Sequence, residues 1–211
     1  MELLDERWTL LVVRELLAGS RHFTELQRGV PRMSPSLLSR RLRTLTRAGV
    51  VERREDAGRV VYELTGAGEE LRPVVEALGA WGIRWVPELG DEDLDPHLLL
   101  WDMHRNVDLD AVPEGRTVVQ LTFAEVVPGD RDWWLVIQPD GVDICSDDPG
   151  FDVDVVVECE LSTLTRIWRG DRSWDDALRA GTLRVDGPPE LRRRLPEWLE
   201  LSAFAAVPRP A

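Results

Sequence analysis

The sequence predicts a protein of two domains: a mostly α-helical N-terminal domain with one β-hairpin, and a C-terminal α+β domain with an antiparallel sheet. Helix and hairpin signals fill residues 1–86, a Pro-, Gly- and acid-rich segment at 87–94 predicts a linker, and strands grouped with helices fill 95–211. The charge divides at the same place. Residues 1–86 carry 14 Arg and 12 acidic residues, a balance of +2, whereas residues 87–211 carry a balance of −15. This asymmetry favours two units with different partners.

Composition excludes several classes of function. All 26 basic residues of the 211 are Arg, which removes a lysine-containing phosphate loop and a Schiff-base lysine. Two Cys and three His do not form a zinc cluster of the usual spacing, and no hydrolase, dinucleotide or metalloprotease motif occurs. No apolar run approaches the roughly 18 residues of a membrane span, and the acidic start is not a secretory signal. We therefore expect a cytoplasmic protein that is not an enzyme and has no metal, cofactor or membrane partner.

Residues 8–49 read as three helices. The pattern predicts a helix over Trp8–Leu17, a short one over Phe23–Arg28, and a third that begins after Ser34 and ends at Gly49. Ser34 is a good N-cap, and Pro35 suits the first helical position because its missing N–H costs nothing there. Short helices joined by a tight break, followed by a capped helix, predict a helix-turn-helix.

The third helix separates into an apolar and a basic face. Leucines and one alanine lie on one side at helical spacing, and the other side carries Ser36, Ser39, Arg40, Arg43 and Arg47. No acidic residue interrupts the stretch from 32 to 47, whereas an ordinary exposed helix mixes signs to gain ion pairs. A solvated face without a specific partner is the plain alternative. Guanidinium groups with small hydroxyls favour insertion into a DNA major groove. Arg41, nearer the apolar side, is assigned to a structural ion pair or a phosphate contact.

A hairpin and a long apolar helix complete the first domain. Strand-type runs over Val50–Arg54 and Arg59–Leu64 flank a loop at 55–58, which predicts a wing with Arg53, Arg54 and Arg59 at its tip. A helix from Glu69 to about Val86 then follows. It is too apolar to be buried all round in so small a domain, which favours contact with a second copy of the chain.

The ordered motifs of residues 6–85 resemble HxlR-type winged helix-turn-helix regulators. The motifs are Arg7-Trp8-Thr9-Leu10-Leu11, Arg14-Glu15-Leu16-Leu17-Ala18-Gly19, Phe23-Thr24-Glu25-Leu26, Ser34-Pro35, Leu38-Ser39-Arg40-Arg41-Leu42, Ala48-Gly49-Val50-Val51 and Tyr62-Glu63-Leu64-Thr65-Gly66-Ala67-Gly68. The resemblance implies a homodimer that binds double-stranded DNA and pairs through its terminal helices. The chain departs from the family pattern in two places. It starts too late for a sensing Cys that often precedes the Trp motif, which leaves open the part of the dimer surface that the resemblance implies there. Gly66 also stands where a Pro is common.

The second half alternates strands and helices. A helix is expected from Asp95-Pro96 to near Pro113, and a last one from Pro188. Between them the pattern predicts strands over 117–126, 133–138, 142–145, 152–160 and 183–187, with helices around 163–169 and 174–180. Cys159 shares strand parity with Val155 and Val157, which predicts a buried thiol, and Cys145 is expected to be similar. His97 and His104, seven residues apart, offer too few ligands for a zinc site.

Residues of about 116–204 resemble the sterol carrier protein domain. The similarity runs from Leu161-Ser162-Thr163-Leu164 through Trp168-Arg169-Gly170 and 177–187 to Leu191 and Leu195. It implies an apolar tunnel between sheet and helices that takes a hydrophobic small molecule. Ordinary core packing of the tryptophans is the plain alternative to a Trp-lined pocket. The expected pocket residues are Trp101, Phe123, Trp134, Val136, Ile144, Val157, Ile167, Trp168, Leu183 and Trp198.

Two functions from different classes remain open at this point. The first is a DNA-binding transcriptional regulator that binds a near-palindromic operator as a homodimer and responds to a hydrophobic effector in its C-terminal domain. The second is a carrier that transfers or sequesters a lipid or another hydrophobic ligand, with DNA binding secondary. The sequence does not identify the operator or the effector.

Overall fold

The chain folds as two compact units. The computed structural model describes residues 3–86, 89–90 and 93–210, and the units are Met1–Gly82 and Ile83–Ala211. The predicted linker at 87–94 includes residues 87, 88, 91 and 92, which lie outside the described residues. Within the described ranges, no helix is long and apolar enough to cross a membrane, and no three His, Cys, Asp or Glu side chains gather as metal ligands would.

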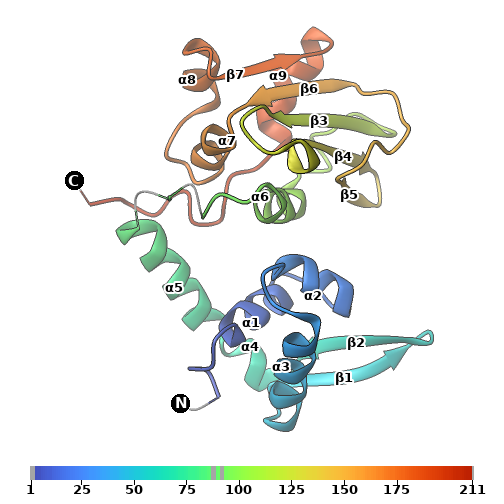
Figure 1. Cartoon of the computed structure of the whole chain (residues 1–211), viewed down its shortest axis with the longest axis vertical. Helices are drawn as coiled ribbons and strands as arrows, with labels where there is room; N and C mark the ends of the chain where they lie inside the picture. Colours follow the sequence, from blue (N-terminus) through green and yellow to red (C-terminus); the bar gives the residue numbers. More distant parts are fainter. Residues whose placement is uncertain (1–2, 87–88, 91–92, 211) are drawn as a thin grey trace. The chain divides into compact units, whose positions relative to one another are not determined.

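The N-terminal unit is a bundle of short helices with a two-stranded hairpin beside it (Figure 1). Its elements are α1 (Thr9–Leu17), α2 (Phe23–Gly29), α3 (Pro35–Arg47), β1 (Val51–Asp56), β2 (Arg59–Leu64), α4 (Gly66–Glu69) and the start of α5 (Arg72–Trp85). The three predicted helices and the hairpin are confirmed. Their core is apolar and closed, with Val12, Leu26, Leu38 and Leu45 fully buried.

A buried carboxylate joins α1 to α2. Glu15 of α1 has no exposed surface, and its Oε1 accepts a bond from Arg14 Nη2 at 2.8 Å. The hydroxyl of Ser20 lies 3.5 Å from the other carboxylate oxygen. Gly29 at the end of α2 lies against this carboxylate so closely that a Cβ on Gly29 would stand 1.9 Å from Glu15 Oε2. The absence of a side chain at position 29 therefore lets the two helices approach each other.

The wing is longer and its turn tighter than expected. Both strands run to a two-residue turn at Ala57 and Gly58, in place of the four-residue loop predicted over 55–58. Both turn residues have positive φ, +46° and +77°. A turn of this kind matches the right-handed twist of the flanking strands, which extends the pairing to Asp56 and Arg59.

The predicted helix from Glu69 to Val86 starts three residues later than expected, and a separate short helix, α4, precedes it. Thr65 caps α4, its hydroxyl accepting the N–H of Gly68, and α5 begins only at Arg72. Pro73 explains the break, because proline has no N–H for the carbonyl four residues earlier and its ring clashes with that carbonyl. Helix α5 contains Pro73 as its second residue, because proline is tolerated in the first turn of a helix.

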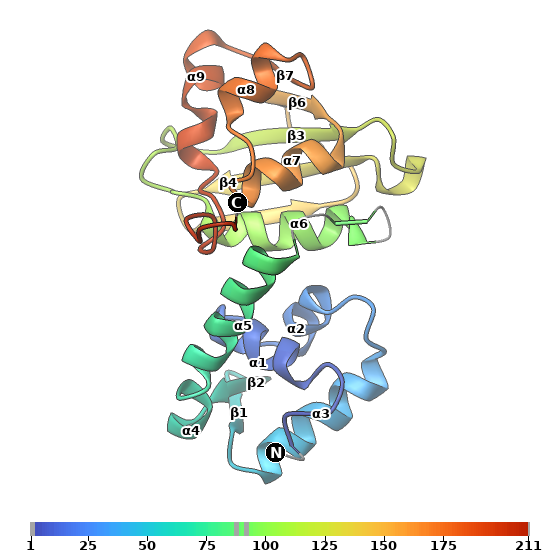
Figure 2. The ribbon, with the colours of Figure 1, turned by 90° about the vertical axis from the view of Figure 1, so that its left-hand side faces the viewer.

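The C-terminal unit is a five-stranded sheet with helices on one face (Figures 1 and 2). Asp95 caps α6 by accepting the N–H of Leu98 at 3.1 Å. The elements are α6 (Pro96–Met103), η2 (His104–Asn106), β3 (Thr117–Phe123), η3 (Pro128–Asp130), β4 (Asp132–Gln138), β5 (Gly141–Cys145), β6 (Val155–Cys159), α7 (Leu161–Trp168), α8 (Trp174–Arg179), β7 (Leu183–Asp186) and α9 (Pro189–Trp198). The expected first helix thus ends at Met103, ten residues before Pro113.

The sheet is mixed rather than antiparallel. Its strand order is β5-β4-β3-β6-β7, and β3 pairs with β6 in parallel while the other pairings are antiparallel. The expectation of an antiparallel sheet is therefore wrong at this one pairing. After the β3–β4–β5 meander the chain returns through 146–154 and enters beside β3 in the same direction. The Asp154 carboxylate fixes that entry by accepting the N–H of Val118 at 2.8 Å.

One face of the sheet carries the core of this unit. Alternate residues of β3, β4, β6 and β7 pack against the four helices, and Figure 2 looks onto α7, α8 and α9 lying over that face. Cys159 belongs to this core, as predicted, and burial raises the pKa of its thiol to about 12, with help from the Glu125 and Glu160 carboxylates. Cys145 differs: it is only half buried, and it lies on the opposite face, paired with Trp134.

A buried arginine organises the turn after α7. Arg169 is 7% exposed; its Nε donates to Asp171 at 2.9 Å and its Nη2 donates to the carbonyl of Val86 at the same distance. Arg209 completes the cluster by donating to Asp171 and to the Arg169 carbonyl. This cluster ties the residue that follows α5 and the C-terminal segment to the end of α7.

We expect Gly29→Ala to destabilise the N-terminal unit by roughly 1–3 kcal/mol, because the added Cβ overpacks the buried Glu15 carboxylate. Gly82→Ala is the matched control: Gly82 is helical and a Cβ there meets nothing within 4 Å. That substitution should raise stability by roughly 0.5–1 kcal/mol. Urea denaturation followed by circular dichroism measures both changes, and equal stabilities for Gly29→Ala and the wild type would contradict the packing described here.

Candidate nucleic-acid interface

Helix α3 is held in a single rotation about its own axis. The Ser34 hydroxyl accepts the N–H of Leu37 at 3.3 Å, and Pro35 occupies the first turn, as the sequence predicts. Three leucines spaced along the helix, Leu38, Leu42 and Leu45, are between 0% and 1% exposed. A helix with one side fixed in the core must present the opposite side to solvent.

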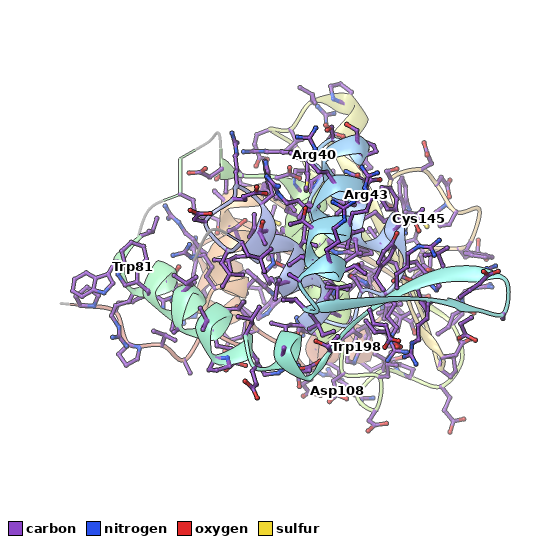
Figure 3. All side chains as sticks on the ribbon, turned by 90° about the horizontal axis from the view of Figure 1, so that it is seen from below. Arg40, Arg43, Trp81, Asp108, Cys145 and Trp198 are labelled. Atoms are coloured by element: carbon purple, nitrogen blue, oxygen red, sulfur yellow. The ribbon has the colours of Figure 1, made fainter. Side chains whose placement is uncertain are left out.

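The side of α3 turned to solvent carries the predicted DNA-contacting residues. Ser36, Arg40, Arg43 and Arg47 are exposed, and Ser39 is half buried. Figure 3 shows Arg40 and Arg43 along the same helix. Arg41 differs from its neighbours: it forms an ion pair with Glu6 and donates to the Arg7 carbonyl at 3.2 Å. Of the two roles considered for Arg41, the structural ion pair is the one formed.

A groove of about 470 Å³ separates α3 from the wing. Three arginines border it, Arg43 and Arg47 from the helix and Arg53 from β1. The remaining lining residues carry hydroxyl groups: Ser39, Thr46 and Tyr62. Positive charge combined with hydroxyl donors is the arrangement that protein surfaces use to hold phosphate oxygens.

The wing arginines do not act as one group. Arg53 stands opposite Tyr62 and Arg54 opposite Val61 in the hairpin, so Arg53 and Arg54 point to different faces. Arg54 forms an ion pair with Glu63. The same carboxylate forms a second ion pair with Arg21, at 3.2 Å. Arg59 shares the face of Arg54 and lies beside the turn, opposite Asp56. The structure thus gathers Ser39, Arg43, Arg47 and Arg53 and leaves Arg54 and Arg59 on the other face.

Sequence reasoning missed two groove residues, Thr46 and Tyr62. Thr46 lies three residues after Arg43, and its hydroxyl donates to the Leu42 carbonyl at 2.8 Å. Tyr62 is the only tyrosine, and its place opposite Arg53 puts it on the groove side of the hairpin. The signal was available: writing the hairpin register out from the turn would have paired Tyr62 with Arg53.

The predicted ligand-pocket residues of the C-terminal unit lie in separate places. Six of them, from β3, β6, β7, α7 and α9, belong to or pack against the helix-covered core: Phe123, Val157, Ile167, Trp168, Leu183 and Trp198. Ile144 packs beside them. Trp134 and Val136 point from the opposite face of β4, and Trp101 lies on α6, stacked on His97 with 6.2 Å between ring centroids. The structure brings seven of the ten together.

Comparison with known proteins identifies the family. The model of the HxlR-like helix-turn-helix family matches residues 3–89. The uncharacterized HTH-type transcriptional regulator YvaP of Bacillus subtilis is 36% identical over 89 residues, which are 41% of this chain and 82% of the relative. The chain belongs to the HxlR-like helix-turn-helix family.

Other relatives fit this membership. The HTH-type transcriptional regulator YodB of Bacillus subtilis is 34% identical over 92 residues, 42% of this chain and 81% of the relative. The solved structure of the reduced form of YodB is 30% identical, with a TM-score of 0.37, and covers 42% of this chain and 90% of that chain. Each of these matches spans less than half of this HxlR-like chain, and the family model ends at residue 89.

The two neighbouring wing arginines allow a matched test by the salt dependence of duplex binding. We expect Arg53→Ala to lower the slope of log K against log salt by about one, because Arg53 borders the groove and would neutralise one phosphate. Arg54→Ala should change the slope much less, because Arg54 is already paired with Glu63. Fluorescence anisotropy at several salt concentrations gives both slopes. A larger loss for Arg54→Ala would show that the other face of the hairpin meets the DNA.

Proposed function

We propose that this chain is a transcriptional regulator that binds double-stranded DNA as a homodimer, with α3 in the major groove and the wing on the backbone beside it. The observation that carries the proposal is the exposed arginine face of α3, which the buried leucines hold in position and which continues into the groove beside Arg53. Membership of the HxlR-like family supports DNA binding in general. The roles of individual residues are part of this proposal.

The exposed residues of α3 and the wing have two proposed roles, contact with base edges and contact with phosphate groups. Arg40 and Ser36 lie toward the start of α3, outside the groove, and the first turns of a recognition helix are the part that contacts base edges. A guanidinium fork matches the O6 and N7 acceptors of guanine, and a serine allows close approach. Arg43, Arg47 and Arg53 surround the groove and suit phosphate oxygens, with the hydroxyls of Thr46 and Tyr62 as further donors.

Alanine at Arg40, Arg43 and Arg47 together should abolish specific binding, whereas Arg40→Ala alone, which removes the guanidinium assigned to base edges, should cost roughly 1–3 kcal/mol. The control is Arg84→Ala with Arg179→Ala, two exposed arginines on α5 and α8. Gel shifts on the promoter of the chain's own gene, with a scrambled duplex as competitor, measure the effect. Equal binding by the triple variant and the wild type would refute the assignment.

Helix α5 supports the homodimer. None of its fourteen residues is buried, yet Val74, Leu78, Trp81 and Trp85 are 44% to 59% exposed and share one side at spacings of four, three and four residues. Trp81 projects from the helix in Figure 3. An apolar stripe of this size on a soluble chain marks an interaction site. A second copy of the stripe would cover it, and the resulting two-fold symmetry fits operator half-sites about 34–36 Å apart.

Trp81→Glu should convert the dimer to a monomer, because a carboxylate at the centre of the stripe would be buried without a partner. Glu76→Gln, on the opposite side of α5, should leave the dimer intact. Light scattering coupled to gel filtration gives both masses. A wild-type chain that stays monomeric at micromolar concentration, or a Trp81→Glu variant that stays dimeric, would contradict the proposal.

We further propose that the C-terminal unit is sterol-carrier-like and takes a hydrophobic small molecule between its sheet and the helices α7 and α9. In the described part of the chain, the buried indole N–H groups of Trp168 and Trp198 have no hydrogen-bond partner. A buried donor without an acceptor is costly, so an apolar ligand that carries one acceptor oxygen would gain affinity there. Four other predicted pocket residues of the same core, Phe123, Val157, Ile167 and Leu183, are apolar and fully buried or nearly so.

Titration with a long-chain fatty acid should change the tryptophan fluorescence, and Trp198→Phe should weaken binding because it keeps a ring but loses the N–H. An alkane of equal length should bind less tightly than the acid. No fluorescence change up to the solubility limit of the acid would contradict the pocket. The same titration followed by a gel shift separates the two functions: altered DNA affinity supports an effector, and unaltered affinity supports a carrier.

A further inference from the structure

The C-terminal unit contains a second hollow, away from the predicted pocket. A cavity of about 530 Å³ lies between the segment 109–115, which leads into β3, and the end of β4 at 137–139. That volume is within the range of small-molecule sites. None of the ten predicted pocket residues lines it, so it is a separate feature of the fold.

The lining combines apolar side chains with negative charge. Leu109, Val112, Pro113, Ile137 and Pro139 supply the apolar part. Asp110 and Glu114 add two exposed carboxylates and Gln138 adds an amide, and no Arg or His is among the lining residues in the described part of the chain. Arg116, next to Gly115 in sequence, has its guanidinium 3.8 Å from the centre of the Phe151 ring.

The segment that bears the two carboxylates is anchored at several points. The N–H of Asp108 donates to the Trp198 carbonyl at 2.9 Å, and the Asp108 carboxylate accepts the N–H of Asp110 at 3.0 Å. Arg194 of α9 donates to the carbonyl of Ala111 at 2.5 Å and lies 3.6 Å from Glu197. Preformed walls lower the cost of ordering on binding.

We propose that this cavity binds an apolar organic cation. An apolar surface favours a hydrophobic body, and two carboxylates with no cation among the lining residues favour a positive charge at the rim. The charge of −15 on residues 87–211 adds a longer-range attraction for cations and repels anions. The ligand class is therefore a quaternary ammonium, a phosphonium or a protonated amine with an apolar body. The site is independent of the DNA-binding proposal.

The test uses two probes of matched shape and opposite charge. Isothermal titration of the full chain with tetraphenylphosphonium should give one site per chain that weakens as salt is added. Tetraphenylborate, the anion of the same shape, should not bind. The double variant Asp110→Asn with Glu114→Gln should weaken the phosphonium affinity by roughly tenfold or more.

The control variant removes the same amount of charge elsewhere. Asp147→Asn with Asp175→Asn changes two exposed acids that do not line the cavity and should leave the phosphonium affinity within about twofold of the wild type, since exposed charges outside the site are screened. No heat of binding at millimolar phosphonium, equal binding of the borate, or equal losses in the two double variants would each overturn the proposal. The last result would mean that net charge attracts the cation without a site.

Discussion

The burial of three leucines on α3 is the constraint on which the rest of the N-terminal unit depends. Leu38, Leu42 and Leu45 fix the rotation of the helix, and every other residue of α3 takes its direction from them. A rotation by one residue, about 100°, would bury arginine and expose leucine, at a cost of several kcal/mol. The arginines therefore do not need to be oriented individually, because the core orients them.

The close contact of α1 with α2 helps to hold α3 in this orientation. Gly29 and the buried Glu15 carboxylate let the helices approach, and α1 in turn packs against α3 and β2. The Arg41 ion pair with Glu6 attaches the middle of α3 to the segment before α1. Two charged pairs thus stabilise the scaffold, while Arg40, Arg43 and Arg47 stay at the surface. This division between structural and exposed arginines is hard to infer from composition alone.

The sequence predicts much of the fold because its local signals are strong. The Ser34-Pro35 start of α3, the Asp95-Pro96 start of α6 and the alternation of Val155, Val157 and Cys159 each encode a local structure, and each is confirmed. The features that the sequence analysis did not predict depend either on pairing between distant parts of the chain or on local signals that were overlooked. The parallel pairing of β3 with β6 depends on a chain return that no local pattern records. The break between α4 and α5 was readable from Pro73, and the different directions of Arg53 and Arg54 were readable from strand parity. Trp134 and Val136 do not join the other predicted pocket residues, because they lie on the face of β4 that the helices do not cover, and the sequence pattern does not show which face that is.

Footprinting of the major groove tests the central claim most directly. Dimethyl sulfate methylates guanine at N7, an atom of the major groove, and adenine at N3, in the minor groove. On a duplex selected by the chain from a random library, an α3 arginine face in the major groove predicts guanine N7 protection in two patches about one helical turn apart. Protection confined to adenine N3, with guanine N7 fully reactive, would contradict the account.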